Sequence, residues 1–185
     1  MYKLLSLRQG HTEALYFLCT LVLISAVSAC TGVPKDVVPV KGFELERYLG
    51  KWYEIARLDH RFERGLVNVT AEYTLRDDGG IRVVNRGLRS DVNEWSEIEG
   101  KAYFVGPEDV GHLKVSFFGP FYASYVVFGL DEQDYQYAFV SGNSTSYLWL
   151  LSRTPAASDE VLALFKARAL ELTFNLESLI YVSHE

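Results

Sequence analysis

The stretch FELERYLGKWYEIAR, residues 43–57, decides the fold. Gly50 lets the chain turn sharply, because glycine adopts backbone angles that other residues avoid. Trp52 follows two residues later and begins a run whose side chains alternate between two faces, as they do along a β-strand. If Trp52 faces inward, the same period also places Glu54, Ala56 and Leu58 on the inner face. We therefore expect a strand over 51–59 whose tryptophan plugs one end of a β-structure.

Short β-rich segments follow this stretch at regular intervals, with turn residues between them. This spacing is typical of a β-sandwich or a β-barrel. Asp77-Asp-Gly-Gly80 predicts a tight hairpin turn, because aspartate and glycine supply the positive φ values that such turns need. The pattern predicts strands over 51–59, 66–76, 80–89, 96–105, 111–118, 121–131, 135–141 and 146–152.

The pattern changes after Pro155. Ser158 is a suitable N-cap for an amphipathic helix with apolar residues at Val161, Leu164, Phe165 and Leu172. A short final strand is expected over 179–183. The pattern alone does not decide between a closed eight-stranded barrel and an open sandwich with a solid core.

The first thirty residues differ from the rest of the chain. A basic leader precedes an apolar run over 14–29 that is shorter than the roughly 20 residues of a membrane-spanning helix and ends in small residues, which predicts a cleaved signal peptide over 1–29. Val27-Ser-Ala-Cys30 resembles the bacterial lipobox, in which the cysteine is acylated; a chance cysteine after an ordinary signal peptide is the alternative. We expect a lipidated N-terminus and flexible tether over 30–42, and one domain over 43–185.

The composition narrows the class of protein. Apolar residues make up 49% of the chain and aromatic residues 14%, which suits a β-rich globular domain. The net charge of −6 argues against nucleic acid or an anionic membrane face as a partner. Cys19 lies in the expected leader, so no disulfide is expected in the exported protein.

Three motifs carry a specific resemblance. Gly50-Lys-Trp52, the segment 131–135 and Leu151-Ser-Arg-Thr-Pro155 resemble, in this order, the three signatures of the lipocalin family. The resemblance implies an all-β fold: an eight-stranded antiparallel up-and-down barrel, or calyx, with one C-terminal helix packed outside and a short final strand. Trp52 and Arg153 are expected to close one end of the barrel through a cation–π contact rather than to touch a ligand.

The segments 62–65, 114–122 and 147–155 are most similar to the bacterial branch of the lipocalins, which is related to apolipoprotein D. This resemblance implies a protein anchored in the outer membrane through Cys30 and facing the periplasm, since Thr31 rather than aspartate follows the cysteine. It also implies the binding and storage or transport of fatty acids, lysophospholipids or similar amphiphiles for envelope maintenance.

Period-two alternation gives a list of side chains expected to line a lipid cavity. Small residues among them would leave room for an acyl chain, although large aromatic residues filling the interior is the alternative. The candidate cavity residues are Glu54, Ala56, Leu58, Ala71, Tyr73, Val83, Asn85, Phe104, Val115, Val126, Phe128 and Tyr137.

The loop with Phe118, Phe121 and Tyr122 is expected at the barrel mouth. Three aromatic residues in one loop suit a lid over the ligand, a membrane contact or a homodimer patch; simple packing on the rim is the alternative. Basic residues near the same mouth are candidates for contact with an anionic head group, with a solvated loop as the alternative: Arg57, His60, Arg61 and Arg64.

No metal site, cofactor site or catalytic triad can be argued from the sequence, and we expect a binding protein rather than an enzyme. A second hypothesis is a lipid-modifying enzyme or isomerase that uses Glu54, whose pKa burial would raise, with Tyr73 or Tyr137. A third is a structural envelope protein that self-associates through the aromatic loop.

Overall fold

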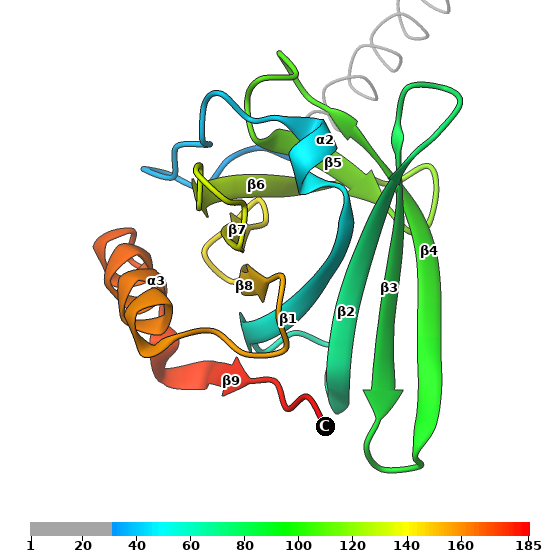
Figure 1. Cartoon of the computed structure of the whole chain (residues 1–185), viewed down its shortest axis with the longest axis vertical. Helices are drawn as coiled ribbons and strands as arrows, with labels where there is room; N and C mark the ends of the chain where they lie inside the picture. Colours follow the sequence, from blue (N-terminus) through cyan, green and yellow to red (C-terminus); the bar gives the residue numbers. More distant parts are fainter. Residues whose placement is uncertain (1–30) are drawn as a thin grey trace, which may run out of the picture.

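The computed structural model describes residues 31–185, so the expected signal peptide and Cys30 lie outside the described residues. Eight strands form most of the fold (Figure 1). Each strand pairs antiparallel with the next, and β1 pairs with both β2 and β8. The strands are β1 (Gly50–Leu58), β2 (Leu66–Leu75), β3 (Ile81–Arg89), β4 (Glu94–Phe104), β5 (His112–Ser116), β6 (Ala123–Leu130), β7 (Tyr137–Ser141) and β8 (Leu148–Ser152).

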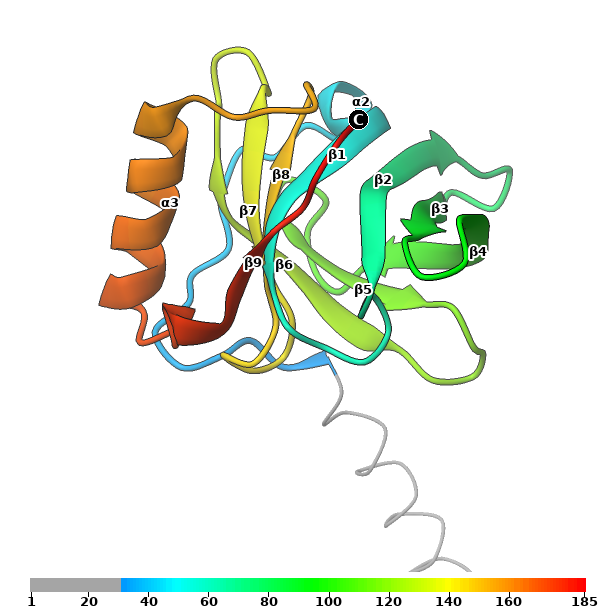
Figure 2. The ribbon, with the colours of Figure 1, turned by 90° about the horizontal axis from the view of Figure 1, so that it is seen from below.

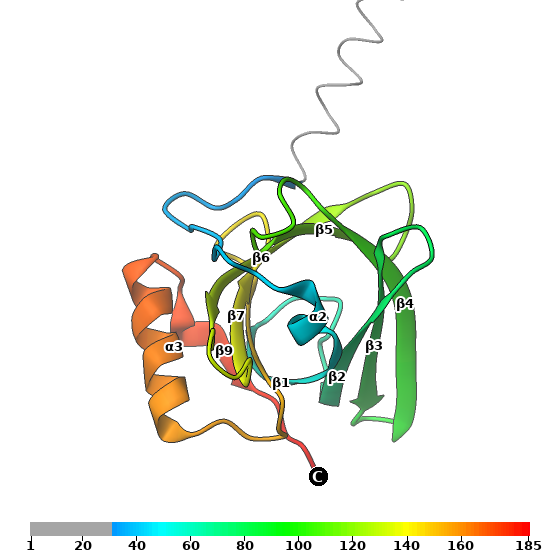
Figure 3. The same ribbon diagram turned by 45° about the horizontal axis from the view of Figure 1, so that its top comes forward.

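The pairing of β1 on both sides closes the sheet into a ring, which Figure 3 shows nearly along the barrel axis. The eight-stranded antiparallel barrel is therefore confirmed, and the open sandwich is excluded. The tight turn after β2 is also present: Gly79 has a φ of 78°, and the backbone N–H of Gly80 donates to Oδ1 of Asp78 at 3.0 Å. A side chain at position 79 would be strained by this φ.

Strand β1 changes partners along its length. Its first half pairs with β2, its second half pairs with β8, and its last residues, 56–58, pair with β9 (Leu179–Tyr181). The chain after β9 then bridges the place where β1 and β2 diverge: the N–H of Val182 donates to the carbonyl of Ile55 at 3.0 Å, and the carbonyl of Ser183 accepts from Asn68 at 2.8 Å. The C-terminal segment thus covers this seam of the barrel (Figure 2).

Helix α3 (Asp159–Glu171) packs outside the barrel, as expected. Ser158 caps it, because its hydroxyl accepts from the N–H of Val161 at 3.4 Å. Phe165 is fully buried with its ring 5.2 Å from that of Phe139, whereas Leu164 is 45% exposed, so its expected place on the packed face is wrong. The 3-10 helix η2 (Leu176–Ser178) links α3 to β9. No helix within residues 31–185 is long and apolar enough to cross a bilayer.

Residues 31–42 do not form the flexible tether that two prolines and a weak pattern predicted. They lie along the barrel wall: Pro34 and Val37 are buried, and Val40 exchanges backbone hydrogen bonds with Val127 and Gly111 at 2.9 Å each. Local composition missed this because the stabilising partners belong to β6 and the β4–β5 loop, far away in the sequence. The segment then leads into α2 (Leu45–Tyr48) at the closed end.

Candidate functional site

The closed end of the barrel brings together the three motifs that the sequence singled out. The guanidinium carbon of Arg153 lies 3.9 Å from the centroid of the Trp52 ring, so the expected cation–π contact is present. Arg153 also donates to the carbonyl oxygens of Arg47 at 2.6 Å, Lys51 at 2.9 Å and Tyr135 at 3.3 Å. The arginine therefore ties α2, the start of β1 and the β6–β7 loop together beneath the barrel.

Aromatic rings fill the space above this arginine. The ring of Tyr48 lies 4.7 Å from that of Trp52 at a tilt of 32°, and the indole N–H of Trp52 donates to the carbonyl of Tyr48 at 2.8 Å. Phe43 lies 5.0 Å from the ring of Tyr48. All three side chains are buried, so this end of the barrel is closed to solvent.

The upper interior of the barrel is lined mainly by apolar side chains from β1 to β8. Of the candidate cavity residues, Ala71, Tyr73, Val83, Phe104 and Val115 belong to this inner cluster. Asn85 faces the same side, because it is the direct cross-strand partner of Ala71. Glu54 also lies on the inner side, because it is two residues after Trp52 and precedes the bulge in β1.

Five candidate cavity residues lie elsewhere, and their expected inward orientation is wrong. Ala56, Leu58, Val126 and Phe128 belong to a second apolar cluster, which packs between the barrel wall and Phe165 of α3; Tyr137 packs against that cluster. Their place beneath the helix removes them from the set of side chains that can line an interior ligand site.

The errors have two physical causes. A bulge between Glu54 and Ala56 breaks the period of two in β1, so residues beyond it exchange faces. In β6 both faces are buried, one by the barrel interior and one by α3, so the apolar run over 125–128 carries no alternation that identifies the inner face. Tyr125 and Val127, rather than Val126 and Phe128, point inward.

Sequence reasoning also missed a set of hydrogen-bonded tyrosines inside the barrel. The hydroxyl of Tyr125 lies 2.6 Å from that of Tyr48 and 2.9 Å from that of Tyr73. Burial raises the pKa of all three phenols, so they stay protonated and hydrogen-bond one another within an otherwise apolar wall. Tyr125 would have been found from the sequence if the odd-numbered residues of β6 had been assigned to the inner face.

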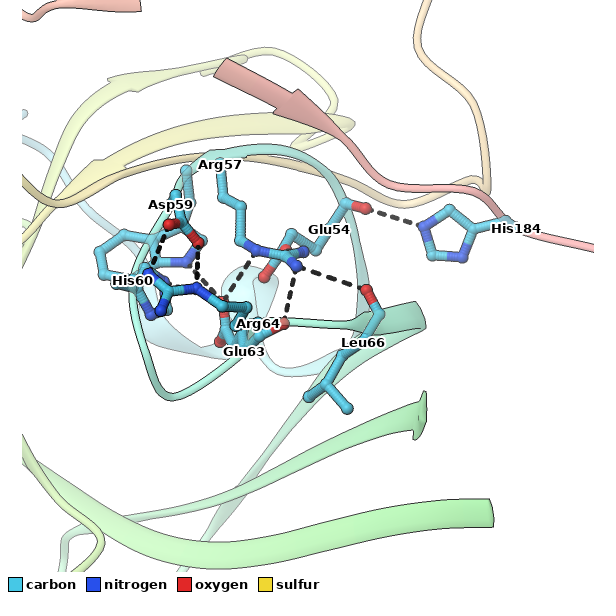
Figure 4. A network of polar contacts seen from close by, with 9 residues as sticks. Glu54, Arg57, Asp59, His60, Glu63, Arg64, Leu66 and His184 are labelled. Atoms are coloured by element: carbon cyan, nitrogen blue, oxygen red, sulfur yellow. Dashed lines mark hydrogen bonds and ion pairs between the residues drawn. The ribbon is translucent and has the colours of Figure 1, made fainter. Parts of the chain in front are cut away.

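A second polar group, which we call the mouth cluster, lies where β1 ends and the loop to β2 begins (Figure 4). It comprises Glu54, Arg57, His60, Glu63 and Trp149. Arg57 is 2% exposed and donates to Oε1 of Glu54 at 2.6 Å and to the carbonyl of Glu63 at 2.7 Å. Oε2 of Glu63 accepts from the indole N–H of Trp149 at 3.1 Å and lies 3.0 Å from Nε2 of His60.

The pKa values of the two carboxyl groups in the mouth cluster are shifted in opposite directions. Burial raises the pKa of Glu54 well above its ordinary value, and the nearby charge of Glu63 raises it further against the opposing effect of Arg57. Burial also acts to raise the pKa of Glu63, but the adjacent His60 ring nitrogen and the hydrogen bond from Trp149 outweigh it, so this pKa is lowered. Glu63 is thus the carboxylate that keeps its charge beside Arg57, and Glu54 accepts a proton first.

The arginines expected at the mouth have different environments. Arg57 is committed to protein acceptors and is not free to meet a head group. Arg64 pairs with Asp59, and Arg61 lies over the ring of Phe62 at 5.0 Å; both are exposed on the β1–β2 loop.

The aromatic loop between β5 and β6 divides into two parts. Tyr122 packs on the wall between Tyr103, 6.4 Å away, and the ammonium of Lys114, 5.2 Å away. Phe118 and Phe121 are 66% and 77% exposed, so rim packing does not account for them. Within residues 31–185, no group of three or more His, Cys, Asp or Glu side chains is arranged to hold a metal ion.

A barrel closed at one end by a tryptophan–arginine contact, with α3 outside, defines a class of binding proteins. Residues 43–184 match the model of the lipocalin-like domain, and the chain belongs to the lipocalin family. It is 57% identical over 168 residues to the outer membrane lipoprotein Blc of Vibrio cholerae, covering 91% of this chain and 96% of that protein. It is 32% identical to apolipoprotein D of Rattus norvegicus, covering 68% and 69% of the two chains.

Solved structures support the fold independently. Insecticyanin from the tobacco hornworm Manduca sexta superposes with a TM-score of 0.64, covering 83% of this chain and 87% of that one, at 21% identity. At this identity the likeness concerns the barrel architecture alone.

Proposed function

We propose that this protein is an outer-membrane lipoprotein that binds a single-chain amphiphile, such as a fatty acid or a lysophospholipid, inside its barrel. The observation that carries the proposal is the state of the inner wall near the mouth. Val115, Phe117, Tyr125 and Trp149 face inward yet remain only half-buried, whereas side chains in a filled core are fully buried. An apolar wall that stays partly accessible is suited to an acyl chain.

The chemistry of the two ends supports this orientation of the ligand. The lower end is sealed by Trp52 and Tyr48, so a chain enters from the mouth with its methyl end first. Polar groups concentrate at the mouth, where Glu63 and Trp149 lie, and the polar end of an amphiphile belongs there.

The anchor is proposed on separate grounds. Cys30 ends a lipobox-like sequence, and the Vibrio cholerae relative is named an outer membrane lipoprotein. Acylation of Cys30 would hold the protein at the periplasmic face of the outer membrane. The role in envelope maintenance then consists of storing or carrying lipids close to the bilayer that contains them.

Binding rather than catalysis is the proposed activity. In the alternative of an isomerase, Glu54 acts with Tyr73 or Tyr137, but Tyr137 packs outside the barrel and Glu54 is held by Arg57. No observation favours a reaction over binding.

Native mass spectrometry of the full-length protein, purified from its own envelope, tests the proposal by identifying what it carries. After delipidation, a lysophospholipid with a brominated acyl chain should quench the fluorescence of Trp149. Ala71→Phe fills the inner wall and should reduce binding, while Ala163→Phe on the exposed face of α3 is the matched control. A protein that is purified empty and binds neither fatty acid nor lysophospholipid would refute the proposal.

A further inference from the structure

The first described residues are fastened to the barrel wall. The carbonyl of Thr31 lies 3.1 Å from a ring nitrogen of His112, and the hydroxyl of Ser124 donates to the carbonyl of Gly32 at 2.6 Å. We call these four residues the anchor clasp. Its position is reinforced downstream, because Pro34 and Val37 are buried.

The anchor clasp lies on the wall of β5 and β6, with His112 at the first residue of β5 and Ser124 nearer the open end. Ser124 is the second residue of β6, which begins directly after the loop that carries Phe118 and Phe121. Figure 2 shows the blue start of the described chain at the bottom of the view, on the same side as the loops joining β1 to β2, β5 to β6 and β7 to β8. Helix α2, which marks the closed end, lies on the opposite side.

This geometry restricts the place of a lipid anchor. A free tether of a dozen residues would reach about 20 Å in any direction. Cys30 instead directly precedes the clasped Thr31, and neighbouring Cα atoms lie only about 3.8 Å apart. Acyl chains on Cys30 would therefore start about one residue from the anchor clasp.

The surface at that end has the chemistry of a bilayer contact. Phe118 and Phe121 project from one loop, and Phe62, 61% exposed, projects from another. Exposed aromatic side chains of this kind insert at the boundary between head groups and acyl chains. The contact is apolar, so it does not depend on electrostatic attraction, which the net charge of −6 disfavours at an anionic bilayer.

We propose that the anchor clasp and these phenylalanines hold the open end of the barrel against the bilayer in which the protein is anchored. The proposal rests on the proposed acylation of Cys30. Its consequence is that a lipid passes between bilayer and barrel without crossing bulk water. The bilayer surface is the proposed occupant of this face, rather than a second copy of the chain.

Hydrogen–deuterium exchange of the full-length lipoprotein in vesicles of phosphatidylethanolamine and phosphatidylglycerol tests this orientation. Exchange in loops 59–65 and 117–122 should slow by severalfold relative to detergent-solubilised protein. Loops 76–80 and 131–136, at the closed end, should be unchanged. Equal protection at both ends, or protection of the closed end alone, would overturn the proposal.

Two variants isolate the contribution of the phenylalanines. Phe118→Ser combined with Phe121→Ser should remove most of the protection at the mouth. Loss of each phenyl ring should lower the partition of this loop from water into the bilayer by about tenfold. Leu75→Ser, which changes a 56% exposed residue at the closed end, should have no effect. Protection that survives the double substitution, disappears in high salt or rises with the protein-to-lipid ratio would overturn the proposal, the last by indicating a second copy.

Mass spectrometry of the purified protein separates this proposal from the proposed function. If Cys30 carries no acyl chain, the proposed anchor fails. A maleimide phospholipid coupled to Cys30 of the processed chain then supplies the anchor and still decides the orientation by the same exchange measurement.

Discussion

Replacement of Arg153 by alanine should destabilise the barrel strongly, although the side chain is only half-buried and distant from the mouth. The substitution removes three hydrogen bonds to backbone carbonyls, at 2.6, 2.9 and 3.3 Å, and a guanidinium 3.9 Å from the Trp52 ring. Charge-assisted hydrogen bonds contribute about 1.5–3 kcal/mol when buried. Because Arg153 is only half-buried, we expect about 0.5–1 kcal/mol from each of its three hydrogen bonds. The cation–π contact adds roughly 0.5–2 kcal/mol.

The free energy of unfolding should therefore fall by about 3 kcal/mol, which corresponds to a decrease of roughly 6–12 °C in Tm for a domain of this size. Thermal and urea unfolding followed by circular dichroism measure both quantities. Arg153→Lys should lie between the wild type and Arg153→Ala, since lysine keeps the charge but loses the planar fork. Arg168→Ala is the control, because its exposed pair with Glu171 contributes at most about 0.5 kcal/mol. If Arg153→Ala has the same Tm as Arg168→Ala, the contacts of Arg153 do not stabilise the closed end of the barrel.

Three further predictions concern other parts of the fold. Phe165→Ala should lower the free energy of unfolding by about 3–5 kcal/mol through the cavity it leaves beneath α3, whereas Leu164→Ala should change it little in the same urea titration. Glu63 has a lowered pKa in the folded state, so its carboxylate stabilises the fold above the unfolded pKa of about 4.3, and this contribution is lost as the pH falls through the lower folded pKa. Glu63→Gln should therefore weaken the fall in the free energy of unfolding at acid pH, measured by urea titrations at several pH values. An unchanged fall at acid pH would contradict the assignment. Gly129→Ala should destabilise by about 1–3 kcal/mol, because the new methyl group would overlap the ring of Phe139; a Tm equal to that of the wild type would show that the ring moves freely.

Much of the barrel could be predicted from residues that act locally. Alternation in β2 to β5 identified the inner face correctly, because the outer face of these strands is largely solvated and carries polar side chains. Asp78 and Gly79 specified their turn, since few other residues accept its backbone angles. Ser158 specified the start of α3 through its cap.

The candidate site was harder to predict than the fold. Ala56 and Leu58 were assigned to the interior because a bulge in β1 is invisible to a period of two. The mouth cluster joins β1, the loop after it and β8, so the contact of Glu63 with Trp149 spans 86 residues of sequence. No local pattern reports such a contact.

The sequence by itself determined the approximate strand positions and the turn and cap positions, because these depend on local backbone angles and side chains. The closed barrel and the pairing of Trp52 with Arg153 were expected from the resemblance to lipocalins. Only the tertiary structure decided which faces of β6 and β7 line the interior, since α3 buries their outer faces as well. It also decided that residues 31–42 are fastened rather than free, because a segment of weak intrinsic preference is ordered by partners that folding brings to it. Under the proposed acylation of Cys30, the lipid would begin one residue from an ordered segment rather than at the end of a flexible one.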